Sequence, residues 1–136
     1  MSHFHAVVWL DHREARVIDF TVDDAHKVAV HQRGGHRQVH HRSGTIGAGH
    51  APEDLAFFDE IVEAVGDAHE VLLVGPGQAK LALRHYVEQH RKEFARRVVG
   101  LESIDHPSDG ELLGFAKKYF VKVDSMLGTG GLERQR

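Results

Sequence analysis

The chain has 136 residues, a length typical of one folded domain, and 41% of them are hydrophobic, as in ordinary globular proteins. It contains no cysteine, which excludes a disulfide scaffold, cysteine-ligated zinc, an iron–sulfur cluster and a thiol nucleophile. Near the N-terminus the one uninterrupted apolar run, Ala6 to Leu10, is too short for a signal peptide or a membrane span. We therefore expect a cytoplasmic protein with no membrane association.

Charge is distributed unevenly along the chain. The formal net charge is −3 at pH 7, yet no acidic residue lies between Asp24 and Glu53. That segment contains six of the 13 histidines and four basic residues, namely Lys27, Arg33, Arg37 and Arg42. A local excess of one sign indicates a partner of the opposite sign, while the acidic remainder favours solubility.

Three strands are predicted at the start of the chain, over residues 4–10, 14–20 and 27–30. Each is rich in apolar, β-branched or aromatic residues, and short polar turns separate them. Turns this short cannot make a parallel crossover, so the three strands should run antiparallel to their neighbours.

Residues 33–51 have no hydrophobic period and contain five glycines, which predicts a long loop. Pro52, followed by Glu53 and Asp54, begins a predicted helix that Gly66 ends. The apolar run 71–74 predicts a central parallel strand. A helix over 79–94, a strand over 98–104 and a helix over 109–126 follow.

Right-handed crossovers place the parallel strands beside the first strand. The predicted architecture is α/β and ribonuclease-H-like: a five-stranded mixed sheet in the order 3-2-1-4-5, its second strand antiparallel, with three helices on both faces. We expect one domain over residues 1–126 and a flexible tail over residues 127–136.

The turn Gly75-Pro76-Gly77 connects a strand to a helix that carries Lys80 in its first turn. Free N–H groups at such a helix start can hold an anion, so Gly75, Gly77 and Lys80 form a candidate phosphate site. The alternative is a turn that only closes strand against helix. Neither a P-loop nor a dinucleotide fingerprint is present.

This turn and its helix resemble the central domain of archaeal and eukaryotic class-1 release factors and of Pelota. The chain is also similar to a group of small bacterial proteins called translational machinery proteins, through the phrases at residues 6–12, 105–110 and 116–120. The resemblance implies a ribonuclease-H-like fold and a translation-associated role.

In release factors the loop corresponding to residues 33–50 carries a Gly-Gly-Gln tip that promotes peptidyl-tRNA hydrolysis. Here the phrase is Arg33-Gly34-Gly35-His36, with histidine in place of glutamine. Pelota-like factors bind ribosomes without that motif, so the resemblance implies binding rather than hydrolysis. A hydrolytic release or rescue factor is the alternative.

Two further alternatives rest on other side chains. His36, His40 and His41, with His50, could bind a metal ion, although no carboxylate lies among them and no helix is predicted to align them. Asp11 at the end of the first strand, with Glu60 or Glu63, would suit a metal-dependent nuclease. Asp11 is more simply a turn residue.

The favoured function is binding of ribosomal RNA or tRNA through the basic loop, without a cofactor and without a catalytic residue. The residues expected to contact RNA are Arg33, Gly34, Gly35, His36, Arg37 and Arg42. The sequence indicates no oligomeric state.

Overall fold

A computed structural model describes residues 5–32 and 52–127. The chain divides into two compact units, residues 1–106 and residues 107–136, which are described separately. The expectation of one domain over residues 1–126 stays a prediction. The basic loop and the C-terminal tail lie outside the described residues.

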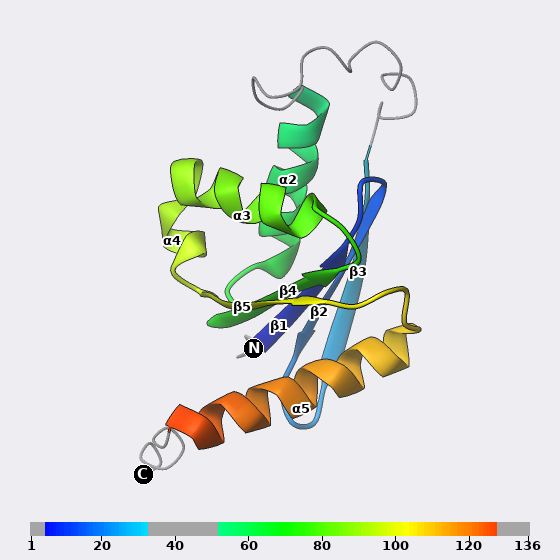
Figure 1. Ribbon diagram of the computed structural model, residues 1–136, viewed down its shortest axis with the longest axis vertical. Coiled ribbons are helices and arrows are strands. Elements are labelled where there is room, and N and C mark those ends of the chain that lie inside the picture. The colour runs from blue at the N-terminus through cyan, green and yellow to red at the C-terminus, as the bar shows by residue number, and fades with distance from the viewer. Residues whose placement is uncertain (1–4, 33–51, 128–136) are drawn as a thin grey trace. The chain divides into compact units, whose positions relative to one another are not determined.

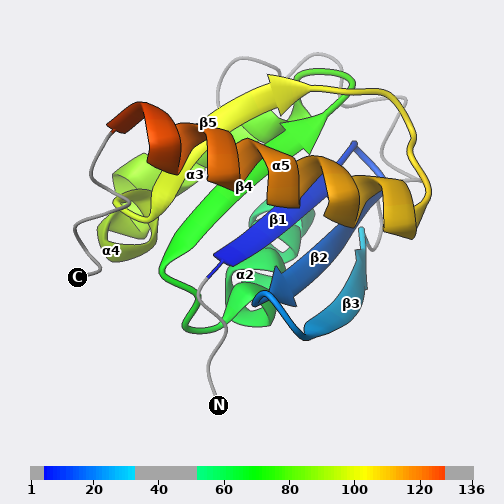
Figure 2. The ribbon, with the colours of Figure 1, turned by 90° about the horizontal axis from the view of Figure 1, so that it is seen from below.

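The first unit contains a five-stranded sheet. Its strands are β1 (His5–Leu10), β2 (Glu14–Phe20), β3 (Ala25–His31), β4 (Glu70–Gly75) and β5 (Val98–Ser103). Their order across the sheet is β3-β2-β1-β4-β5, as Figure 2 shows. β2 runs antiparallel to β1 and β3, whereas β4 runs parallel to β1 and β5. The predicted strand order and directions are therefore confirmed.

Two helices pack on one face of the sheet, α2 (Pro52–Val65) and α3 (Ala79–His90) (Figure 1). The apolar stripe of α2 meets alternate residues of β1, because successive strand residues point to opposite faces. The buried cluster between helices and sheet includes Ala6, Val8, Leu10, Val17, Phe57, Phe58, Ile61, Val65, Leu73, Leu83 and Val87. As predicted, α2 ends just before Gly66, whose φ of 66° is a left-handed conformation that glycine adopts without strain.

The helix predicted over residues 79–94 is interrupted. α3 ends at His90, Arg91 leaves the helical conformation with φ −135° and ψ 65°, and a short helix α4 (Lys92–Ala95) follows. The Arg91 guanidinium lies 3.1 Å from Asp59 and 3.7 Å from Glu63, both on α2. This ion pair forms only when the end of α3 packs against α2, so the apolar pattern of the sequence could not predict it.

Tyr86 of α3 joins the same contact, because its hydroxyl donates a 2.9 Å hydrogen bond to Asp59. Partial burial, together with the hydrogen bond and charge of Asp59, raises the pKa of Tyr86 above its ordinary value. Tyr86, Arg91 and two carboxylates, Asp59 and Glu63, thus form a polar contact between α2 and α3.

The second unit contains α5 (Asp109–Leu127), close to the predicted range. Ser108 caps it: the Glu111 N–H donates to Ser108 Oγ at 3.1 Å, and the Ser108 N–H donates to Glu111 Oε1 at 2.9 Å. This reciprocal pair is a capping box, which satisfies two N–H groups at the helix start. Leu112, Ala116 and Phe120 recur every fourth residue and so lie along one stripe of α5.

Gly75, at the end of β4, has no room for a side chain. Its φ is 153°, and a Cβ at this position would collide with the carbonyl oxygen of Leu10 on β1. We expect Gly75→Ala to lower the free energy of unfolding by about 3 kcal/mol, since backbone strain and a backbone clash add. Urea denaturation measures this change.

Gly77→Ala is the matched control, because no atom lies within 4 Å of a Cβ placed there. It should change the free energy of unfolding by less than about 1 kcal/mol. Equal urea midpoints for the two variants would contradict the close packing of β1 against β4.

Candidate functional site

The carboxyl ends of β1, β3, β4 and β5 meet at one edge of the sheet, because β2 alone runs in the opposite direction. In open α/β sheets this edge is where ligands commonly bind. It carries the Asp11 turn after β1, Gln32 after β3, the Gly75 turn after β4, and Asp105 and His106 after β5. The candidate site is built from these four segments.

The Gly75 turn holds Lys80 pointing inward. Lys80 is only 6% exposed, and its Nζ donates hydrogen bonds to the carbonyl oxygens of Gly75 at 3.0 Å and Gly77 at 2.7 Å. These bonds stabilise the turn between β4 and α3 and satisfy a buried ammonium group. Gly77, Lys80 and Gly75 are thus brought together as the sequence suggested. Their role toward a phosphate stays a prediction.

Asp11 organises the turn between β1 and β2. Its Oδ1 accepts hydrogen bonds from the N–H groups of Arg13 at 2.8 Å and Glu14 at 3.0 Å. A short aspartate side chain that accepts from the next N–H groups stabilises such a turn locally. These two hydrogen bonds satisfy Oδ1 of Asp11 within the turn, so its position requires no metal ion.

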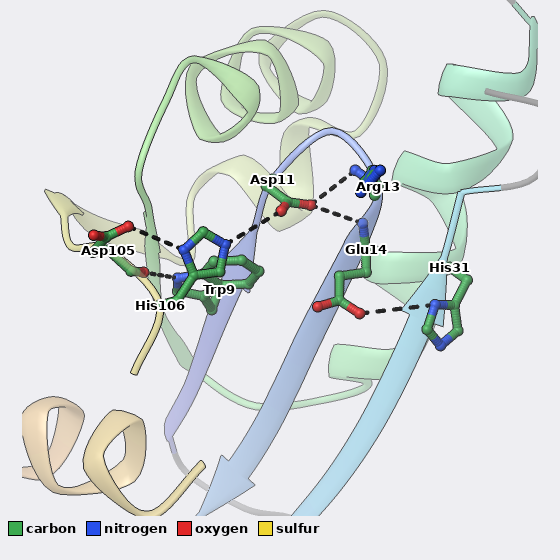
Figure 3. A network of polar contacts seen from close by, with 7 residues as sticks. All are labelled: Trp9, Asp11, Arg13, Glu14, His31, Asp105 and His106. Atoms are coloured by element: carbon green, nitrogen blue, oxygen red, sulfur yellow. Dashed lines mark hydrogen bonds and ion pairs between the residues drawn. The ribbon is translucent and has the colours of Figure 1, made fainter. Parts of the chain in front are cut away.

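The other oxygen of Asp11 faces His106. His106 Nε2 lies 3.7 Å from Asp11 Oδ2, and its Nδ1 lies 3.0 Å from Asp105 Oδ1, so the imidazole sits between two carboxylates (Figure 3). The ring also packs against Trp9, with centroids 4.8 Å apart. The Trp9 indole N–H donates to the Asp105 carbonyl at 2.6 Å, which ties the end of β5 to β1.

Sequence reasoning did not identify His106 as part of a site, although it quoted the phrase that contains it. Nothing in a local pattern indicates that residues 105 and 106 meet residues 9 and 11, since this contact depends on how the strands order. Glu14 and His31 form a further pair 3.9 Å apart in the same region (Figure 3). The edge therefore carries mixed charges.

A hydrogen bond joins Gln32, the residue after β3, to the first turn of α2. Gln32 Nε2 donates a 2.6 Å hydrogen bond to Asp54 Oδ1 in the first turn of α2. The residues that flank the segment 33–51 on both sides therefore lie at the carboxyl edge. The expected RNA contacts at Arg33, Arg37 and Arg42, and the histidines of the metal alternative, all lie outside the described residues.

A metal centre of the nuclease type also needs converging ligands. Within residues 5–32 and 52–127, no three His, Asp or Glu side chains gather closely enough to hold a metal ion. Glu63, on α2, lies 3.7 Å from the Arg91 guanidinium. In the same part of the chain, no helix combines the length and apolar character needed to span a membrane.

The fold is similar to solved structures of Pelota. The Pelota protein of Thermoplasma acidophilum matches over 85% of this chain with a TM-score of 0.57 and 20% sequence identity. Pelota of Archaeoglobus fulgidus matches over 96% of this chain with a TM-score of 0.61 and 12% identity. At these identities the likeness establishes the fold alone.

The chain spans only about a third of the Pelota structures, 32% of the first and 37% of the second. No protein-family model and no curated protein sequence matches it. The two structural matches confirm, at the level of the fold, the resemblance to Pelota that the Gly75 turn indicated.

Lys80→Met tests how far the buried ammonium supports the turn. The substitution keeps the apolar stem and removes both hydrogen bonds, so we expect the free energy of unfolding to fall by about 2 kcal/mol. Lys92→Met, at an exposed position of α4, is the control and should change it by less than about 0.5 kcal/mol. An unchanged urea midpoint for Lys80→Met would remove Lys80 from the stability of the turn.

Proposed function

We propose that this chain, whose fold resembles part of Pelota, is a translation-associated factor that binds ribosomal RNA or tRNA through the basic segment of residues 33–42. The fold likeness supports the translation-associated part of the proposal. The acid-free run of Arg33, Arg37 and Arg42 supports the RNA-binding part.

One observation supports the proposal most: Gln32, which directly precedes the basic segment, bonds to Asp54 at the start of α2, so the chain is held at the carboxyl edge of the sheet on both sides of residues 33–51. A segment anchored in this way loses less conformational entropy on binding than a free tail does. Three arginines in ten residues can each neutralise a phosphate, and the acidic body of the protein disfavours nonspecific adhesion elsewhere.

A function in binding rather than hydrolysis fits the residues. Gly34 and Gly35 provide a permissive backbone, but His36 lacks the flat amide of glutamine, with a donor beside an acceptor. We therefore propose association with ribosomes without release of peptide from peptidyl-tRNA.

Salt dependence tests the RNA-binding proposal. Each phosphate that is neutralised releases close to one counterion, so log affinity falls with log salt in proportion to the contacts made. Changing Arg33, Arg37 and Arg42 together to alanine should flatten that slope by about two to three units. Fluorescence anisotropy with a labelled RNA stem-loop across a potassium chloride series measures it.

A second triple variant removes the same charge from another surface: Arg84→Ala on α3, Lys92→Ala on α4 and Arg96→Ala directly after α4. Its slope should match that of the wild type. If the two triple variants instead behave alike, RNA binding does not depend on the basic segment.

A further inference from the structure

β3 lies at one edge of the sheet, and its outer side pairs with no other strand in the part of the chain that the structure describes (Figure 2). The Gln32 N–H, directly after β3, donates to the carbonyl oxygen of Arg13 and so points toward the β2 side. Backbone groups alternate in direction along a strand, so the N–H and C=O groups of Ala29 and His31 point outward, away from β2. A row of outward backbone groups is a template for one more strand.

An open groove of about 450 Å³ runs between β3 and α2. Val28 and Val30 of β3 and Ala64 of α2 give the groove apolar walls, and Glu60 and Glu63 of α2 add two carboxylates. Val28 and Val30 also contact the apolar cluster under α2, so their side chains lie on the helix-covered face of the sheet. A strand added beside β3 would direct every second side chain to that face, and therefore into the groove.

The charge of the groove indicates which side chains fit. Glu60 and Glu63 are three positions apart and so lie on one side of α2. The Glu63 side chain is 75% exposed, and its contact with the Arg91 guanidinium, at 3.7 Å, is longer than a hydrogen bond. Arginine or lysine can lay its aliphatic stem on the apolar walls and bring its charged end to these carboxylates. Phosphates would be repelled here, so the groove suits a basic peptide rather than RNA.

A second copy of the chain is the competing occupant of an edge strand. Two β3 edges joined about a two-fold axis would place both copies of α2 on the same face of one continuous sheet. Glu60 and Glu63 of each copy would then line one shared groove, and four carboxylates would repel one another. Charge therefore favours a basic segment of a different protein over a second copy.

We propose that the outer edge of β3 binds an extended segment of a partner protein by strand addition, with basic residues at alternate positions directed toward α2. Hydrogen bonds to the β3 backbone supply affinity, and the basic side chains in the groove supply selectivity. The inference goes beyond the RNA-binding proposal and does not depend on it, because it uses only residues of β3 and α2.

A fluorescein-labelled peptide of alternating arginine and threonine, as long as the seven residues of β3, tests the proposal by fluorescence anisotropy with the full chain. We expect saturable binding of this peptide and none of a peptide that alternates glutamate and threonine. Methylating one alternate set of the peptide's backbone N–H groups should abolish binding, and methylating the other set should preserve it, because only one set faces β3. If both methylated peptides bind as the parent does, charge alone attracts them and the proposal is wrong.

Variants of the chain test the two halves of the site. Glu60→Gln combined with Glu63→Gln should weaken binding of the arginine–threonine peptide about tenfold, because each substitution removes one charge contact. Asp67→Asn combined with Glu102→Gln removes the same charge from exposed positions elsewhere and should leave binding unaltered. Ala29→Pro removes an outward N–H, the kind of edge position where proline is tolerated, and should weaken binding about tenfold or more. Should Ala29→Pro fail to fold in a thermal melt, the methylated peptides make the same test.

Two further outcomes would overturn the proposal. One is the absence of saturable binding of the arginine–threonine peptide to the wild-type chain. The other is a dimer in analytical ultracentrifugation that Ala29→Pro dissociates, which would assign the outer edge of β3 to a second copy.

Discussion

The close approach of Gly75 to Leu10 is the constraint on which the carboxyl edge depends. At the end of β4 the backbone lies so near the Leu10 carbonyl that no side chain fits between them. This contact fixes where β4 stops relative to β1, and therefore where the chain turns into α3. Lys80 then closes the turn from inside by bonding to two of its carbonyl oxygens.

The arrangement of the other segments at the carboxyl edge depends on this close approach of β4 to β1. Because β1 and β4 end together, the Asp11 turn lies beside the start of α3, and a cavity of about 180 Å³ forms between them and α2. The bond between Gln32 and Asp54 closes the same region from the side of β3. The basic segment thus begins directly after this hydrogen-bonded part of the fold, and binding residues are commonly carried on loops that a folded scaffold positions.

Much of the fold could be predicted from local sequence. The apolar run 71–74 indicated a central strand, the short turns after β1 and β2 indicated antiparallel pairing, and Gly66 indicated where α2 ends. What could not be predicted are contacts made only after folding. The second predicted helix is interrupted at Arg91, which pairs with Asp59 of α2, and His106 lies close to Asp11 although the two residues follow different strands.

The candidate site was likewise predictable only in part. Glycine and lysine in the Gly75 turn were recognisable from their spacing, but the inward direction of Lys80 depends on the carbonyl oxygens that the turn presents. The cavity at the carboxyl edge was not predictable, because two residues of its lining, Gln32 and Asp54, are 22 positions apart and meet only through tertiary structure. Fold likeness alone does not assign function, so the proposal of RNA binding rests on the charge of the basic segment and on its attachment at this edge.

Cosedimentation of the full chain with purified ribosomes tests the translation-associated role most directly. The account predicts that the protein pellets with ribosomes at low salt and is released as salt rises, because phosphate contacts supply the affinity. A protein that stays in the supernatant at every salt concentration, while purified ribosomes pellet normally, would contradict it.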